Sequence, residues 1–134
     1  MSTQDNLKVA QGIDTAFGQG NIPAILNVFA DDMELHEPPG GTPPFTGTYH
    51  GRDGAGTFFQ EMVGAVDILA MEPQEFVAQG DTVVVLGRYC FRPKTTGKPY
   101  DTDWAMVWWF RAGKVVKFQI HDDSATEAAA LRGT

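Results

Sequence analysis

Four strand-like runs fill most of the second half of the chain, and they constrain its fold more than any other feature of the sequence. Each run is rich in β-branched and aromatic residues, and a glycine-containing turn signal separates each run from the next. The runs cover residues 67–77, 82–92, 99–111 and 114–121. Because short connections join antiparallel strands, the four runs predict an antiparallel meander.

Helical patterns precede this meander and follow it. Apolar residues recur at helical spacing over residues 7–17, and Asn21 caps a second short apolar stripe. A third helix starts at Asp53, and a last short helix begins at Asp123 or Ser124. The apolar faces of these helices need a sheet to cover them, because neither layer can hide its apolar side alone.

One short strand lies between the second and third helices. It covers residues 33–37 and is stopped by a loop of prolines and glycines over residues 38–44. The order helix, helix, strand, helix, four strands and helix predicts a single α+β domain over residues 1–134. Long strands twist and coil, so we expect a curved antiparallel sheet that wraps around the N-terminal helices and forms a cone with a cavity inside.

Composition excludes several classes of partner and cofactor. The net charge of −7 repels phosphate backbones and anionic lipids, so neither nucleic acid nor a membrane is an expected partner. The first residues lack the pattern of a signal peptide, which favours a cytoplasmic location. The single cysteine, Cys90, excludes a structural zinc site on ligand count, and no metal is expected. Residues 51–56 lack the lysine of a phosphate-binding loop, so no cofactor is expected either.

Glu37 is the strongest candidate for a functional residue. It ends a strand whose alternate residue, Leu35, is apolar, so the period of two directs both side chains to the buried side. Burial would raise the pKa of the Glu37 carboxyl toward neutrality, as a general base or acid requires. The alternative is a strand-end glutamate that faces solvent or pairs with an arginine.

The centre of the third strand in the meander is apolar on both faces. Trp104, Met106 and Trp108 share one face, whereas Val107 and Trp109 share the other. A sheet that is apolar on both sides has to be covered twice, and the simplest second cover is another copy of the chain. We therefore expect a homodimer formed through the outer face of the sheet.

Three polar residues have two interpretations each. Arg88 either points inward, where it would need Glu37 or Asp123 as a partner, or forms a structural ion pair. His121 alternates with the apolar residues of its strand, so it faces outward unless the strand end twists it inward. Asp123 caps the last helix, or Ser124 caps it and leaves Asp123 as a second carboxylate of the pocket. We favour the second interpretation of Asp123.

Seven short segments, taken in order, match the landmarks of a known family: Phe29-Ala30-Asp31-Asp32, His36-Glu37-Pro38, Gly47-Thr48-Tyr49 with Gly51-Arg52-Asp53, Gly87-Arg88-Tyr89, Ala112-Gly113-Lys114-Val115-Val116 and Asp123-Ser124-Ala125. The chain resembles SnoaL-like proteins of the nuclear-transport-factor-2-like superfamily, which also contains the ketosteroid isomerases. The resemblance covers nearly the whole chain and implies the cone-shaped fold. It restricts the reaction less, because this fold hosts isomerases, polyketide cyclases, epoxide hydrolases, dehydratases and non-catalytic binding proteins.

The resemblance also implies roles for individual residues. Glu37 matches the position of the general-base aspartate of ketosteroid isomerases. Their oxyanion-hole tyrosine and protonated aspartate fall on Ile13 and about Met106, so that pair of hydrogen-bond donors is missing. Asp123 matches an aspartate of related SnoaL-like proteins. By the same comparison Trp104 is a cavity wall that can stack on a flat ring, and its alternative role is plain core packing.

Together these arguments predict a set of site residues and a function. The predicted catalytic residues are Glu37 and Asp123, and the predicted substrate-binding residues are Trp104, Met106, Tyr49, Arg88, His121 and Phe58. The predicted protein is a cofactor-independent enzyme that moves a proton on a small hydrophobic, cyclic or polyketide-like molecule, as an isomerase, cyclase or dehydratase does. A non-catalytic domain of the same fold that binds a hydrophobic ligand is the alternative.

Overall fold

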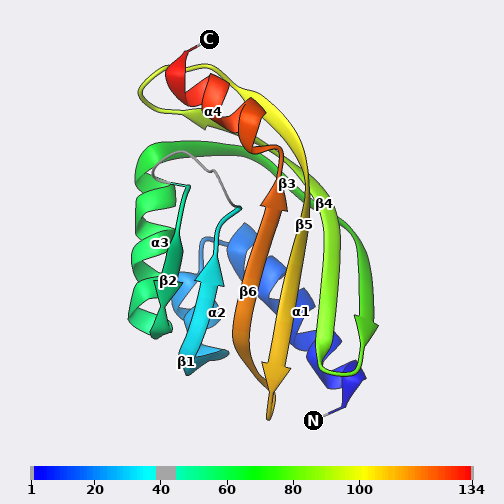
Figure 1. Ribbon diagram of the computed structural model, residues 1–134. Helices are drawn as coiled ribbons and strands as arrows, with labels where there is room; N and C mark the ends of the chain where they lie inside the picture. The colour runs from blue at the N-terminus through cyan, green and yellow to red at the C-terminus, as the bar shows by residue number, and fades with distance from the viewer. Residues whose placement is uncertain (1, 39–44, 134) are drawn as a thin grey trace.

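Within residues 2–38 and 45–133, the computed structural model contains four helices and one six-stranded sheet (Figure 1). The helices cover the inner face of the curved sheet, so the predicted α+β class is confirmed. Residues 39–44, which hold most of the predicted proline-rich loop, lie outside the described residues. In the described part of the chain, no helix combines the length and the apolar composition needed to cross a membrane.

The first two helices form where capping residues are available. α1 covers Thr3–Gly18 and α2 covers Ile22–Asn27. Ser2 and Asp5 form a capping box at the start of α1, and the Asn21 side chain accepts a backbone hydrogen bond at the start of α2. The predicted Asn21 cap is therefore confirmed, and α1 begins earlier than its apolar pattern.

The later elements agree with the predicted runs except at some ends: β1 begins at Phe29 and ends at His36 rather than covering residues 33–37, and α3 begins at Gly51 rather than at Asp53. The third and last helices are α3 (Gly51–Ala65) and α4 (Ser124–Arg132). The strands are β1 (Phe29–His36), β2 (Thr48–His50), β3 (Val66–Gln79), β4 (Thr82–Pro93), β5 (Tyr100–Arg111) and β6 (Lys114–Asp122). The short β2 was not predicted, because it has only three residues to carry a pattern.

The strands lie in the order β2-β1-β6-β5-β4-β3, and β3 to β6 form the predicted antiparallel meander. β1 differs from the prediction, because it pairs in parallel with β6 and brings Leu35 beside Phe118. The expectation of an all-antiparallel sheet is wrong for this pairing. The two strands are far apart along the chain, so no local pattern specifies how they meet.

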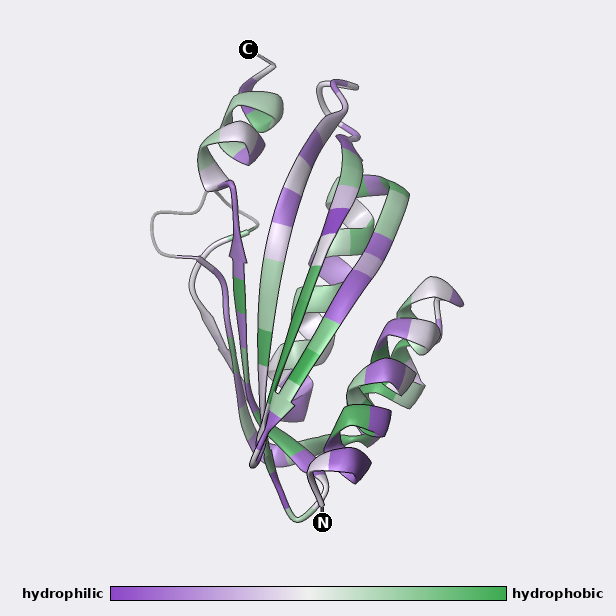
Figure 2. Ribbon diagram, turned by 90° about the vertical axis from the view of Figure 1, so that its right-hand side faces the viewer, coloured by the Kyte–Doolittle hydropathy of each residue, from purple (hydrophilic) through white to green (hydrophobic). Residues whose placement is uncertain are grey.

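The layers form a cone. α1 packs against α2 and against β3 and β4, at one end of the sheet. In the side view the sheet and α1 diverge from the end that carries the N-terminus (Figure 2). The space between the layers widens toward the opposite end, which is where α4 follows β6.

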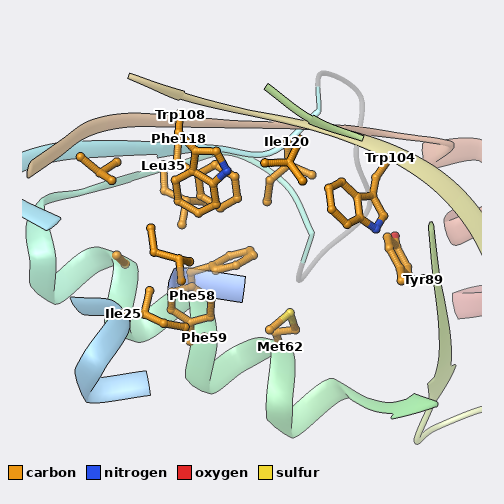
Figure 3. Packing of buried hydrophobic residues seen from close by; sticks show 14 of the residues in the cluster. Ile25, Leu35, Phe58, Phe59, Met62, Tyr89, Trp104, Trp108, Phe118 and Ile120 are labelled. Atoms are coloured by element: carbon orange, nitrogen blue, oxygen red, sulfur yellow. The ribbon is translucent and has the colours of Figure 1, made fainter. Parts of the chain in front are cut away.

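Aromatic side chains fill the narrower part of this space. Trp108 of β5 is 2% exposed and stacks on Phe118 of β6, with the ring centroids 3.6 Å apart. Phe58 and Phe59 of α3 point toward them from the opposite layer (Figure 3). This cluster buries large apolar surfaces, and this burial stabilises the cone.

Gly87 in β4 leaves room for the indole ring of Trp104 on the neighbouring strand. The two residues are paired in register, and a Cβ atom at residue 87 would lie 2.5 Å from a ring carbon of Trp104. A side chain there would displace the ring or the strand. The Gly87-Arg88-Tyr89 segment therefore has a packing role at its first residue.

Candidate functional site

A cavity lies between α1, α3 and the inner face of the sheet. It holds about 610 Å³ of empty space, its open mouth included. Apolar side chains form most of its wall, among them Phe58 and Phe59 from α3 and Met106, Trp108 and Phe118 from the sheet. A mostly apolar cavity with a few polar groups in its wall is typical of a small-molecule site.

Glu37 reaches the cavity from the position directly after β1. Its backbone N–H donates a hydrogen bond to the carbonyl of Gly47 at 3.0 Å, which holds the backbone at this point. The residue is 7% exposed, and burial together with the nearby charge of Asp122 raises the pKa of its carboxyl to about 8. Within the described residues its carboxyl oxygens accept no hydrogen bond. Glu37 thus lines the cavity with a carboxyl that no other described residue holds by a hydrogen bond.

Two further carboxyl groups line the same cavity near Glu37. The Tyr89 hydroxyl donates to Oδ2 of Asp122 at 2.8 Å, and the Tyr100 hydroxyl donates to Oε2 of Glu127 at 3.3 Å. Burial is the main cause that raises both pKa values, that of Glu127 to about 9 with help from the charges of Asp122 and Glu37. We call Glu37, Asp122 and Glu127 the acid cluster.

The acid cluster has no basic side chain beside it in the described wall of the cavity. No lysine, arginine or histidine is found among the described residues that line the cavity. Burial and mutual repulsion therefore keep some of the three carboxyls protonated at neutral pH, while others can ionise. Neighbouring carboxyls in different protonation states can act as a general acid and a general base. Over the described part of the chain, no group of three or more histidine, cysteine, aspartate or glutamate side chains is arranged to hold a metal ion.

A fourth carboxyl, that of Asp14, enters the cavity from α1. Burial raises its pKa to about 7. Its Oδ2 atom is buried and has no hydrogen-bond partner among the described residues. Because α1 packs on β3 and β4, Asp14 lies across the cavity from the β1 and β6 ends that lead to Glu37 and Asp122.

The structure brings three of the predicted site residues together. Glu37, Met106 and Phe58 all line the cavity. Trp104 is buried on the same face of the sheet but is not part of the cavity wall. Its indole points toward Tyr89 (Figure 3), so its observed role is packing beside the acid cluster.

Tyr49 and Arg88 lie elsewhere. The Tyr49 hydroxyl donates to the carboxylate of Glu61 at 2.8 Å, and burial with this bond raises its pKa to about 12. Arg88 lies on the outer face of the sheet and forms ion pairs with Glu72, at 2.7 Å, and with Asp101. The inward interpretation of Arg88 is therefore wrong, and the structural ion pair is confirmed.

The end of β6 differs from the prediction by one residue. His121 is exposed, as its alternation indicated. Asp123 is exposed too and caps α4, because its side chain accepts the backbone N–H of Thr126 at 3.1 Å, and hydrogen bonds with Thr126 lower its pKa. The prediction that Ser124 caps the helix is wrong, and Asp122 enters the cavity in place of Asp123.

Sequence reasoning missed the other carboxyls, although two of them carried a signal. Asp122 follows Ile120 at strand spacing, which places it on the inner face. Asp14 lies three residues before Phe17, on the apolar stripe of α1. Glu127 carried no such signal, because a glutamate in the first turn of a helix usually serves the helix end.

Together, the cone and its acid-lined cavity define a protein of the nuclear-transport-factor-2-like class. A sequence model of the SnoaL-like domain matches residues 9–118, and this chain belongs to that family. The sequence resemblance is thereby confirmed. A search among curated proteins returned no match to the sequence.

Solved structures support the same assignment. An NTF2-like protein from Burkholderia xenovorans is 34% identical, with 98% of each chain covered and a TM-score of 0.88. TerC, crystallised with polyporic acid, is 25% identical, with 96% of this chain and 98% of that chain covered and a TM-score of 0.82. A protein from Mesorhizobium loti described as a SnoaL-like polyketide cyclase shares the fold at 17% identity, covering 85% of this chain and 96% of that chain with a TM-score of 0.72.

Proposed function

We propose that this protein is a cofactor-independent enzyme that moves a proton on a small apolar substrate of the cyclic or polyketide-like kind. The acid cluster carries the proposal, because it gathers Glu37, Asp122 and Glu127 in a cavity whose other walls are mostly apolar. Buried carboxyls without a cation lower stability, so a fold that contains them has another use for them. Carboxyls with perturbed pKa values in a cavity are typical of proton-transfer sites.

In the proposed reaction, the ionised carboxylate of Glu37 removes a proton from a carbon atom next to a carbonyl group. The electron pair of the broken C–H bond moves toward the carbonyl oxygen and gives an enolate. A protonated carboxyl of Asp122 or Glu127 donates a hydrogen bond to this oxygen, in place of the donors missing at Ile13 and Met106. Glu37 then returns the proton to another atom of the substrate, so no cofactor is consumed.

Glu37 is the base in this proposal because its carboxyl is the least restrained of the three. Tyr89 holds Asp122 and Tyr100 holds Glu127, whereas Glu37 accepts no hydrogen bond within the described residues. A pKa of about 8 leaves a fraction of Glu37 ionised at neutral pH and keeps that fraction strongly basic.

The wall of the cavity supports a flat, apolar substrate. Phe58, Phe118 and Trp108 offer aromatic surfaces against which a ring can pack. The co-crystal of TerC with polyporic acid supports a small organic ligand for a relative that covers almost the whole chain. The carboxyls of the cavity disfavour anionic substrates, so we propose an uncharged one.

Exchange of carbon-bound hydrogen for deuterium tests the proposal before the natural substrate is known. The probes are the bicyclic ketones 1-tetralone and 2-tetralone in D₂O, with exchange next to the carbonyl followed by proton NMR. The wild-type protein should accelerate exchange, and Glu37→Gln should lower the enzyme-dependent rate by about 10²- to 10⁴-fold, because the amide cannot take up the proton. Glu75→Gln, the same change at an exposed site on β3, should retain the wild-type rate.

The outcome separates catalysis from binding. If the wild-type protein accelerates deuterium exchange and Glu37→Gln accelerates it equally, Glu37 is not the base. Probes that bind in the cavity but exchange no faster than in buffer would contradict the enzyme proposal and favour the ligand-binding domain.

We also propose that two copies of the chain associate through the outer face of the sheet. Val77 is 50% exposed and Leu86 is 38% exposed on this face, next to the half-buried Val107 and Trp109. A second copy related by a two-fold axis would cover this apolar stripe with the same stripe. Light scattering at micromolar concentration should give twice the chain mass of 14.6 kDa, and a monomer would contradict the proposed interface.

A further inference from the structure

Asp14 is a half-buried residue with a buried carboxyl oxygen that the proposed proton transfer does not use. Its side chain lines the cavity, and its Oδ2 atom has no hydrogen-bond partner within the described residues. Tyr89 and Tyr100 satisfy members of the acid cluster, but neither bonds to Asp14. A buried carboxyl oxygen rarely lacks a hydrogen-bond partner in proteins. A ligand group that hydrogen bonds to Asp14 would supply this partner.

Trp108 presents a complementary group in the same cavity. Its indole Nε1–H is buried and has no acceptor among residues 2–38 and 45–133. An unpaired donor costs stability much as an unpaired acceptor does. Besides one oxygen each of Asp122 and Glu127, the cavity wall thus holds one carboxyl oxygen and one N–H donor that lack a partner among the described residues.

Asp14 is separate from the acid cluster. No charge effect of Glu37, Asp122 or Glu127 contributes to the pKa of Asp14, which burial alone raises. Asp14 belongs to α1, which packs on β3 and β4, whereas Glu37 follows β1 at the other side of the sheet. The cavity therefore has a polar group on each of two facing walls, with apolar surface between them.

We propose that Asp14 is a second anchor for the substrate and that the substrate carries a hydroxyl or phenol group at the end away from the acid cluster. This inference rests on the proposed function, because it assumes that the other end of the substrate meets Glu37. The hydroxyl hydrogen bonds to the carboxyl of Asp14. The indole N–H of Trp108 donates to an oxygen of the ligand.

The two unpaired groups select a hydroxyl over other polar groups. A carboxylate or phosphate would be repelled by the carboxyls that line the cavity. An ammonium group would suit Asp14, but it has no lone pair to accept the N–H of Trp108. A hydroxyl both donates and accepts, so a ligand that carries one can serve both residues.

Calorimetric binding of three naphthalene probes tests this anchor without any measurement of catalysis. 2,6-Dihydroxynaphthalene has a hydroxyl at each end, 2-naphthol has one, and 2-(aminomethyl)naphthalene has one cationic end. For the wild-type protein the diol should bind about tenfold more tightly than 2-naphthol, as one additional hydrogen bond predicts. In Asp14→Leu the two probes should bind equally, because leucine keeps the branched shape of the side chain and removes the carboxyl.

Two further variants serve as controls. Asp14→Asn keeps an acceptor and a donor at the same place and should retain most of the tenfold ratio. Asp53→Leu makes the same change at an exposed carboxylate of α3 and should retain the whole ratio. Asp14→Leu should fold at least as stably as wild type, because it replaces an unpaired buried carboxyl by an apolar group. Urea unfolding checks this point before the binding ratio is interpreted.

Each result has one meaning. Equal binding of diol and 2-naphthol to wild type, or a tenfold ratio that survives in Asp14→Leu, would overturn the anchor. Tighter binding of the aminomethyl probe than of the diol, lost in Asp14→Leu, would overturn the choice of a hydroxyl. Suppose that deuterium exchange depends on Glu37 but that Asp14→Leu leaves the ratio of diol to 2-naphthol affinity unchanged. This result would leave the proposed function intact and refute only the anchor. The expected ratios without any exchange would refute only the proton transfer.

Discussion

On the outer face of the sheet, Arg88 pairs with Glu72 and Asp101, so charges of opposite sign lie side by side at the surface. On the inner face, Glu37 and Asp122 share a cavity whose described lining contains no basic side chain. Water solvates the outer group, and its ion pairs add little to stability. The inner group is desolvated, and burial raises both of its pKa values. The charged groups of the outer face therefore have the solvated ion pairs of an ordinary protein surface. The carboxyls of the inner face lower the stability of the fold, and their raised pKa values are those that proton transfer requires.

Replacing each of two adjacent tryptophans, one on either face, tests this contrast, and it should change the free energy of unfolding more than the other variants do. Trp108 is buried against Phe118, whereas Trp109 is half-buried on the outer face, with Nζ of Lys117 4.8 Å above its ring. Trp108→Ala should lower the free energy of unfolding by about 3–5 kcal/mol, because it leaves a cavity in the aromatic core. Trp109→Ala should lower it by about 1 kcal/mol, because little surface is uncovered.

Urea unfolding measures both losses, at a protein concentration where light scattering shows single chains. Equal losses for the two variants would mean that the outer face is as deeply packed as the core. The distinction between the two faces would then fail.

The pH dependence of stability sharpens the comparison at the inner face. The pKa of Glu37 is about 8 in the fold, against an ordinary value of 4.5, so the folded state binds protons more tightly than the unfolded state. Its contribution to stability is complete below the unfolded pKa and is lost as pH rises through the folded pKa. Between these two values wild type should lose on the order of 1–3 kcal/mol relative to Glu37→Gln.

Urea midpoints of the two proteins across this pH range measure the difference. Glu72→Gln, the same change on the outer face, should keep the wild-type slope. If Glu37→Gln and wild type show the same change of stability with pH, the claim that the Glu37 carboxyl is desolvated would be contradicted.

Local patterns predicted most of the fold. Capping residues located the helices, turn signals located the meander, and the period of two placed Glu37 on the inner side with Leu35. The parallel pairing of β1 with β6 could not be predicted this way, because it depends on how the whole sheet assembles. Recognition of the family predicted the cone that this pairing closes along one side.

The site could be predicted only in part. Glu37, Met106 and Phe58 follow from parity, helix spacing and resemblance, and all three line the cavity. The resemblance indicated Asp123, but strand parity with Ile120 selects Asp122, and the local rule was correct. The burial of Asp14 depends on how α1 lies over the sheet, which a helical pattern alone does not determine.

Direct titration of the Glu37 carboxyl tests the central claim, that the inner carboxyls are desolvated groups poised for proton transfer. Carbon-detected NMR follows the side-chain carboxyl carbon of Glu37 as pH changes, and the Glu37→Gln spectrum assigns the signal. The account predicts a midpoint of about 8, caused by burial and by the neighbouring charge of Asp122. A midpoint near the ordinary value of 4.5 would contradict it, because a carboxyl that ionises there is solvated and too weak a base for the proposed reaction.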